Sequence, residues 1–434
     1  MGVNSNGTVM MDQGVFENLG SVTWDTTAKT TGFTAVSGNG YFVNTTSGAI
    51  TVTLPSSPSA GDLVGIKDYA NTADTNAITI GRNGSNIDGV ANDFTITTEG
   101  LSALLVYVDA TKGWLITNSS QASDISQSAT FITATGGTIT TCGDYKIHTF
   151  TSPGTFTVTQ AANPAGGPNN VDYLVVAGGG GGAGAGGCTV SAGGGGAGGH
   201  RSGFPSPAGT TPVSVQGYPI TVGGGGSGGP GSPAPNLKGS DGSSSSGVGI
   251  TSAGGGAGGQ NNAANAGGSG GGSSYSGGSP GAGNTPPVSP PQGNPGGATN
   301  NGSAGSGGGG IGAAGTPHPG LQFPSSNGTP GGNGVANSIN GSSVTRAGGG
   351  GGGGFSNNFP TPSPQPGIGG SGGSGGGGTG GTSTRFDSGS PGGNATTNTG
   401  GGGGGSGSGG TNSPINRPGG NGGSGIVIIR YKYQ

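Results

Sequence analysis

The sequence predicts an all-β protein with two parts of different composition. A small antiparallel β-sandwich or barrel comes first, and a bundle of polyglycine II helices with long loops follows, held on a β-sheet anchor. Three observations predict this. Short alternating apolar and polar runs fill the first part of the chain. Glycine supplies 115 of the 434 residues, and 94 of these lie between Gly178 and Gly425. Two strongly apolar runs bracket that glycine-rich region.

The first part of the chain is predicted to form short strands. Ile50, Val52 and Leu54 alternate with threonines, which is the period-two pattern of a half-buried strand. Similar runs follow and are separated by turn residues such as Asn83-Gly84. We therefore expect an N-terminal arm, a β-domain and a linker, at residues 1–37, 38–118 and 119–135.

An anchor of β-strands is predicted around the glycine-rich region. Residues 136–177 contain a hairpin over 136–160, with its turn at Ser152-Pro153-Gly154, and the apolar strand Val171–Val176. Residues 426–434 form a C-terminal anchor strand. We expect the hairpin and both bracketing strands to pair in one sheet, with residues 219–222 as a candidate further member.

Residues 178–425 are expected to pack as polyglycine II helices. Composition alone favours a flexible linker, but the region is about 250 residues long and ends in a strong strand. Collagen is excluded because runs such as 348–354 ignore a strict triplet. Glycine lacks a Cβ, so extended backbones can approach closely and hydrogen-bond to each other. Interior helices must therefore be nearly pure glycine, whereas outer ones can carry small polar residues.

Charge and targeting features narrow the function classes. Residues 1–150 hold 12 acids and 5 bases, and residues 151–434 hold 3 acids and 7 bases, which is too dilute for a nucleic-acid groove. The N-terminal residues lack the basic and apolar regions of a secretory signal. No apolar run approaches the ~20 residues of a membrane span. We expect no nucleic-acid partner and no membrane insertion.

No catalytic, cofactor-binding or metal-binding residue is predicted, and we expect the protein not to be an enzyme. Cys142 and Cys188 are expected to be buried free thiols, since two cysteines make neither a disulfide framework nor a zinc site. The many GxGxxG strings arise from composition and open no helix. His148 is expected on a strand, and His200 at the end of a glycine run. Few acids remain for a glycosidase pair.

Residues 38–118 resemble a small β-domain found in tail fibres and other virion proteins of marine tailed phages. The resemblance rests on GYFVNTTSGAITVTLP, GDLVGIKDYA, ITIGRNGSNIDG and LLVYVDATKGW. It implies a structural module that attaches the protein to other virion proteins or forms trimers, and therefore a homotrimer.

Residues 136–434 resemble the glycine-rich domain of phage tail proteins. The motifs are DYKIHTFTSPGTFTV, VDYLVVAGGGGGAG, GGGGAGGHR, YPITVGGGG and GGSGIVIIRY. Related tail-tip adhesins of T-even-type phages carry variable loops on polyglycine helices. The resemblance implies an exterior virion protein of the tail, made in the host cytoplasm without a signal peptide, that recognises a bacterial glycan or outer-membrane protein.

Candidate receptor-binding residues are aromatic and basic side chains between the glycine runs, because such side chains stack and hydrogen-bond on sugars and protein loops. They are Phe204, Tyr218, Tyr275, His318, Phe323, Phe355, Phe359, Arg385 and Phe386. The alternative for each is a ring that caps the bundle end. The leading interpretation is a tail fibre or adhesin. The alternatives are a purely structural virion component, such as a head decoration or tail accessory protein, and an ice-binding protein.

Overall fold

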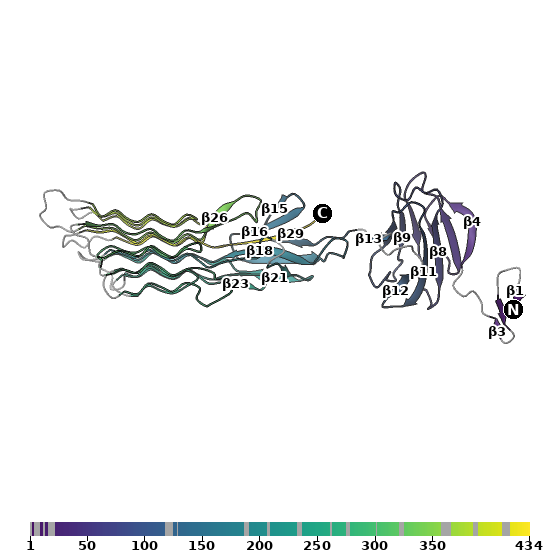
Figure 1. Ribbon diagram of the computed structural model, residues 1–434, viewed down its shortest axis with the longest axis horizontal. Helices are drawn as coiled ribbons and strands as arrows, with labels where there is room; N and C mark the ends of the chain where they lie inside the picture. The colour runs from purple at the N-terminus through teal and green to yellow at the C-terminus, as the bar shows by residue number, and fades with distance from the viewer. Residues whose placement is uncertain are drawn as a thin grey trace. The chain divides into compact units, whose positions relative to one another are not determined.

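The computed structural model describes residues 2–3, 9–11, 14–15, 22–117, 125–127, 129–185, 191–205, 209–231, 237–260, 263–274, 278–300, 302–320, 325–356, 366–384, 389–409 and 417–434. Within these ranges the regular elements are strands, without any α-helix (Figure 1). The prediction of an all-β protein is confirmed. The chain divides into two compact units, Met1–Thr130 with Asn163–Gly167, and Phe131–Ala162 with Pro168–Gln434.

Two five-stranded sheets form the first unit, in the orders β12-β11-β8-β6-β4 and β13-β10-β9-β7-β5. Neither sheet closes into a barrel, so the unit is a sandwich. A small sheet of β1 (Gly2–Val3), β2 (Val9–Met11) and β3 (Gly14–Val15) precedes them. The strands of the sandwich are β4 Thr23–Lys29, β5 Phe33–Thr34, β6 Asn39–Val43, β7 Ile50–Thr53, β8 Leu63–Asp68, β9 Ile78–Gly81, β10 Phe94–Ile96, β11 Ser102–Asp109, β12 Gly113–Ile116 and β13 Ile125–Gln127.

The strand directions correct the antiparallel arrangement that we predicted. β4, β6 and β8 run parallel to one another, and so do β5, β7 and β9. Within the described part of the sandwich, the antiparallel pairs are β9–β10, β10–β13, β8–β11 and β11–β12. From β4 to β9 the chain alternates between the two sheets. Every second strand is therefore added to the same sheet, and it runs in the same direction as the strand before it in that sheet. The period-two pattern specifies the buried face of a strand but not its direction.

The core of the first unit lies between its two sheets. Ile50, Val52 and Leu54 are at most 4% exposed, whereas Thr51 between them is exposed. Trp114 is fully buried in the same core. The alternation in the sequence therefore identified the inward face of this strand correctly.

Two further sheets form one end of the second unit, and we call them the anchor. The first has the order β15-β16-β29-β18-β19, with β20 also paired to β18, and the second has the order β14-β17-β21. Their bounds are β14 Thr133–Thr135, β15 Thr138–Cys142, β16 Tyr145–Phe150, β17 Gly154–Gln160, β18 Asn170–Val176, β19 His200–Ser202, β20 Thr211–Pro212, β21 Gly217–Ile220 and β29 Ile426–Lys432.

The two bracketing strands pair as predicted. β18 and β29 are antiparallel, from Asp172 opposite Arg430 to Val176 opposite Ile426. The predicted hairpin over 136–160 is wrong, because β15 and β16 form a hairpin and β17 belongs to the second sheet, where it pairs with β14 and β21. The reason is that β18 and β29 are buried on both faces, and Phe156 and Val158 of β17 cover one of these faces.

The free thiol of Cys142 also corrects an expectation. Cys142 is exposed at the end of β15, not buried, because every residue of this edge strand is exposed. Cys188 lies outside the described residues.

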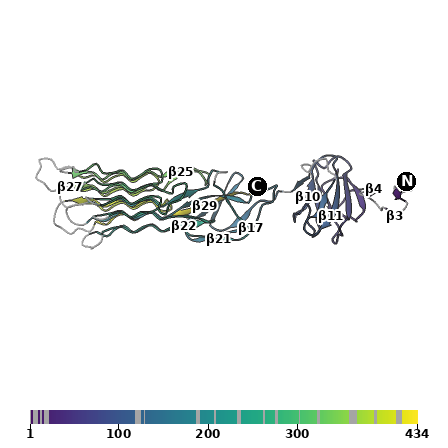
Figure 2. The ribbon, with the colours of Figure 1, turned by 60° about the horizontal axis from the view of Figure 1, so that its bottom comes forward.

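Beyond the anchor, glycine-rich segments lie side by side in a regular lattice (Figures 1 and 2). Residues 178–185 show its rule, because consecutive N–H groups donate to three different neighbours in turn. Gly178, Gly181 and Gly184 donate to the carbonyls of Ser243, Ser240 and Leu237 at 3.0, 2.9 and 2.7 Å. Their followers Gly179, Gly182 and Ala185 donate to Gly423, Gly420 and Arg417 at 2.9, 2.9 and 3.1 Å. A repeat of three residues is the period of a polyglycine II helix.

The carbonyl groups of the same segment complete its surroundings. These carbonyls accept hydrogen bonds from residues 226–229, 255–258 and 403–406, which run parallel to the segment. The N–H groups of the segment donate to residues 193–196, 237–243 and 417–423, which run antiparallel to it. Residues 178–185 therefore have six hydrogen-bonded neighbours. The prediction of a polyglycine II bundle is confirmed for the described residues.

The lattice interior consists of the segments with the purest glycine runs, as predicted. Residues 177–185, 191–199, 347–354 and 400–407 are buried throughout. A Cβ added at Gly350 would lie within 3.0 Å of the backbone of Gly403. In the outer run 223–229, by contrast, only every third glycine is buried. A Cβ at Gly225 or Gly228 would still meet the backbone of a neighbouring segment, whereas one at Gly224 meets nothing within 4 Å. Side chains are therefore excluded from the interior and tolerated on one face of this outer helix.

Short strands close the two ends of the lattice. We call the end where Ala177, Gly199 and Gly425 meet the anchor strands the anchor end, and the opposite one the remote end. The hairpins β22–β23 and β25–β26 belong to the anchor end, and the sheet β24-β27-β28 to the remote end. Their bounds are β22 Ser245–Gly247, β23 Ile250–Ser252, β24 Ser325–Ser326, β25 Val335–Asn337, β26 Val344–Arg346, β27 Phe355–Ser356 and β28 Ser408–Gly409.

Candidate functional site

The lattice runs back and forth, so connections that are distant in sequence share one end. Ala185, Ser191, Ser356, Gly409 and Arg417 are described residues at the remote end, and each borders a range outside the described residues. Asparagine side chains join outer helices between the two ends. Asn327 accepts the N–H of Ile368, and Asn333 accepts that of Ser374, at 2.9 and 3.1 Å. The segments that carry the connections at the remote end are therefore fixed by hydrogen bonds to their neighbours.

Phe355 and His318 are candidate residues that the structure places inside the remote end. Phe355 is 3% exposed on β27, which pairs with β24 and β28. His318 is 1% exposed, and its Nε2 lies 2.7 Å from the hydroxyl of Ser326. Its Nδ1 accepts the N–H of Gly320 at 3.2 Å. Both side chains cap the lattice and offer no exposed ring.

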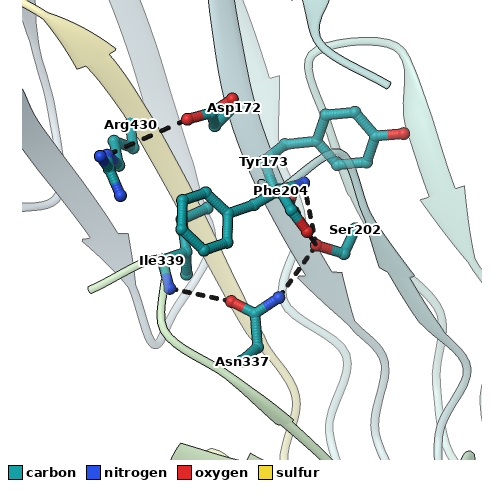
Figure 3. Close-up of polar contacts among 7 residues, drawn as sticks. All are labelled: Asp172, Tyr173, Ser202, Phe204, Asn337, Ile339 and Arg430. Carbon is teal, nitrogen blue, oxygen red and sulfur yellow. Dashed lines mark hydrogen bonds and ion pairs between the residues drawn. The ribbon is translucent and has the colours of Figure 1, made fainter. Parts of the chain in front are cut away.

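Phe204 lies at the anchor end and packs against a charge. The guanidinium carbon of Arg430 is 4.9 Å from the centre of the Phe204 ring and 3.9 Å from that of Tyr145. Arg430 Nε also lies 3.9 Å from a carboxylate oxygen of Asp172 (Figure 3). Burial raises the pKa of Asp172, and the charge of Arg430 opposes this shift. Phe204 is thus part of the anchor structure.

Tyr218 is also part of the anchor. It lies on β21, and its hydroxyl accepts the N–H of Ser214 at 2.7 Å and the side-chain amide of Gln216 at 3.0 Å. Its ring is 6.3 Å from that of Phe156. The remaining candidates, Tyr275, Phe323, Phe359, Arg385 and Phe386, lie outside the described residues.

Sequence reasoning missed a polar cluster at the anchor end. Ser202 Oγ accepts the N–H of Phe204 and the side-chain amide of Asn337 at 3.2 and 3.0 Å, while Asn337 Oδ1 accepts the N–H of Ile339 at 2.9 Å (Figure 3). Asn337 is 135 positions from Ser202 in the chain. No local pattern marks such a contact, because the lattice topology creates it.

Three histidines of the second unit, His148, His200 and His318, lie in surroundings that disfavour their charged form. Ala134 N–H donates to the Tyr431 hydroxyl at 3.1 Å, this hydroxyl donates to His148 Nε2 at 3.1 Å, and His148 Nδ1–H donates to the Gly136 carbonyl at 2.7 Å. This series of hydrogen bonds requires the imidazole of His148 to be neutral. Burial lowers the pKa of His148, and also the pKa values of His200 and His318.

We expect the second unit to lose stability as the pH falls below the ordinary histidine pKa of about 6.5. The unfolded chain then binds more protons than the folded one, so acid favours unfolding, while above this pH these groups add no further stability. The measurement is the calorimetric transition temperature from pH 8 to pH 5. The raised pKa of Asp172 acts in the opposite direction, so the effect of one histidine must be isolated with the variant His148→Gln. In this variant the transition temperature should depend less on pH than in the wild-type protein. An equal pH dependence in both proteins would contradict this assignment.

Neither a cluster of metal-ligand side chains nor a membrane-spanning helix is present among the described residues. Within them, His, Cys, Asp and Glu side chains do not gather in groups of three or more that could hold a metal ion. The described part of the chain also has no helix long and apolar enough to cross a membrane.

Comparison with known proteins identifies the second unit. A search of the curated proteins found no match to the chain. A family model described as a glycine-rich domain matches residues 150–432, from the last residue of β16 to the end of β29. The match therefore includes the lattice and the strands that bracket it, and it covers more than half of the chain. The protein belongs to this family of glycine-rich domains.

Proposed function

We propose that this protein is a tail fibre or adhesin on the exterior of a phage virion, and that it acts by binding without catalysis. The first unit attaches it to other virion proteins, in a homotrimer. The second unit presents loops that bind a glycan or an outer-membrane protein of the bacterial surface. The observation that carries the proposal is the placement of sequence-distant connections at the remote end of one lattice.

The lattice suits such a role for a physical reason. Its backbone groups hydrogen-bond to neighbouring segments at 2.7–3.1 Å around residues 178–185, so the scaffold is ordered without side chains. Substitutions inside it are excluded by backbone contacts. The connections at its end lie outside the long glycine runs, so in this proposal their sequences can vary, as those of binding loops on a rigid scaffold do.

Four of the candidate residues make structural contacts. Phe355 and His318 are buried inside the remote end, whereas Phe204 and Tyr218 are half-buried and make contacts within the anchor, so we assign these four residues to the structure. Tyr275, Phe323, Phe359, Arg385 and Phe386 remain the candidates for receptor contact. Each of them lies between described segment ends of the remote end.

We expect the double substitution Phe359→Ala with Phe386→Ala to reduce adsorption of the phage to its host about tenfold or more, since aromatic anchors dominate binding surfaces. The matched control is Tyr69→Ala, which removes a 58% exposed aromatic ring from the first unit. Adsorption rates of particles with equal amounts of the protein give the answer. Unchanged adsorption in the double variant would contradict the adhesin role and favour a purely structural virion component.

A further inference from the structure

The two outer faces of the sandwich in the first unit differ in composition. On the sheet β13-β10-β9-β7-β5, Thr51 of β7 pairs with Thr79 of β9, and Thr79 pairs with Thr95 of β10. Their neighbours along the strands, such as Val52 and Ile80, point into the core. The three threonines therefore lie on the outer side of this sheet, and we call them the threonine face.

The outer side of the other sheet, β12-β11-β8-β6-β4, carries apolar residues instead. Cross-strand pairing places three rows of residues on this side, because the residues between them along the strands belong to the core. The rows, which we call the apolar face, are Trp24, Gly40, Gly65 and Leu104; Phe42, Lys67 and Ser102; and Leu63, Val106 and Leu115. Trp24 is 39% exposed, and Phe42 and the aliphatic residues of the rows are half-buried. A contiguous apolar surface of this kind marks an interaction site.

Two glycines make room for the Trp24 ring on the apolar face. A Cβ at Gly40 would lie 2.7 and 2.8 Å from Cδ2 and Cε3 of Trp24, and a Cβ at Gly65 would lie 3.4 Å from its Cη2. The Phe42 ring centre is 5.0 Å from that of Trp24. Glycine inside a strand weakens the strand, and it often marks a close approach of another group. Here the two glycines let the indole lie over β6 and β8.

Charge also distinguishes the apolar face from the rest of the unit. Residues 22–117 contain eight acids and four bases, which leaves four net negative charges. The three rows contain no acid, and their one charged residue, Lys67, donates its ammonium group to the carbonyl of Gly100. Two copies of the unit repel each other through acidic surfaces, whereas they can meet at the apolar face without bringing acids together.

The extent and composition of the apolar face favour a second copy of the chain as the occupant. The rows run from Trp24 on β4 to Leu115 on β12, which is about 19 Å at the usual strand spacing and much wider than one sugar ring. Interfaces between identical subunits are more apolar than those between transient partners, and interface cores are rich in aromatic residues and poor in charged ones.

We propose that copies of the chain associate through the apolar face, with each copy turning this face toward the others. The proposal rests on the homotrimer of the proposed function and assigns a surface to it. Burial of Trp24, Phe42 and the aliphatic residues supplies the hydrophobic driving force for association, while the threonine face stays in water. Host binding by the remote end does not depend on this contact.

The test is sedimentation equilibrium of the full chain over a range of concentrations. We expect the wild-type protein to associate. Trp24→Lys and Leu115→Lys, at opposite margins of the apolar face, should each raise the dissociation constant about a hundredfold or more, because identical charges are brought together where water is excluded. The matched control is Thr51→Lys, which adds the same charge at an exposed position of the threonine face and should leave association unchanged.

Tryptophan fluorescence of the wild-type protein gives a second measurement that needs no variant. Trp114 is fully buried, so its emission should stay constant on dilution. Trp24 becomes exposed to water when the copies separate, so the emission should shift to longer wavelength at the concentrations where the mass falls. Calorimetric unfolding shows whether each variant is folded. If one lysine variant is unfolded, the other variant and the fluorescence of the wild-type protein decide.

The possible failures separate this proposal from the proposed function. A wild-type protein that is monomeric at every concentration would overturn both the apolar-face contact and the homotrimer, while adsorption still judges host binding. If the wild-type protein associates and the folded lysine variants associate equally well, only the assignment of the apolar face is overturned. Association that leaves the emission of Trp24 unchanged on dilution leads to the same conclusion.

Discussion

Gly350→Ala is expected to destabilise the second unit by about 3 kcal/mol or more, which would lower its transition temperature by roughly 6 °C or more. Gly350 lies in the interior segment 347–354, and a Cβ there would lie within 3.0 Å of the backbone of Gly403. Its N–H donates to Gly195 at 2.9 Å, and its carbonyl accepts from Gly308 at 2.8 Å. The alanine can be accommodated only if neighbouring helices move apart and these hydrogen bonds lengthen.

The matched control is Gly224→Ala in an outer helix. A Cβ at Gly224 meets nothing within 4 Å, so alanine should be neutral or stabilise by up to about 1 kcal/mol through the unfolded chain. Gly226→Ala, two residues further on, is a sharper comparison, because its Cβ would meet the carbonyl of Ser240. Scanning calorimetry should rank the three variants in the order 350, 226 and 224 from the least to the most stable. Equal effects of all three would refute the requirement for a glycine lattice.

The interior of the lattice could be predicted from sequence because its constraint is local. A helix with six close neighbours leaves no room for a Cβ, so the unbroken runs 348–354 and 400–405 identify interior segments directly. The pairing of β18 with β29 was predictable for a similar reason. Each contains a continuous apolar run, at 173–176 and 426–429, which indicates a strand buried on both faces.

Other features depend on long-range topology and have no local signal. The parallel pairs of β4, β6 and β8 arise because the chain alternates between two sheets, and turn residues do not record which sheet comes next. The contact between Asn337 and Ser202 has the same origin, since the glycine runs between β19 and β25 could be threaded in many orders. The burial of one candidate aromatic residue was unpredictable for a related reason. Phe355 follows an interior helix directly and is buried with it, which a list of aromatic residues could not reveal.

Ile428→Ala is expected to lower the stability of the whole second unit by about 2 to 4 kcal/mol. Ile428 is 1% exposed at the centre of β29, opposite Leu174 of β18 and Thr149 of β16. It packs in the cluster that also holds Val176, where the lattice begins. The interior helices carry almost no apolar side chain larger than alanine. The hydrophobic stabilisation of the unit is therefore concentrated in the anchor, and a cavity there weakens the ordered glycine segments as well.

The matched control is Ile139→Ala, the same chemical change at a 46% exposed position of the edge strand β15, and its effect should stay within about 0.5 kcal/mol. Trp24 and Trp114, the two tryptophans of the chain, lie in the first unit. Their fluorescence should therefore keep its unfolding midpoint while the calorimetric transition of the second unit moves. The lattice must melt together with the anchor if the anchor holds it. A separate lattice transition that Ile428→Ala leaves in place would show that the hydrogen-bonded glycine helices are stable without it.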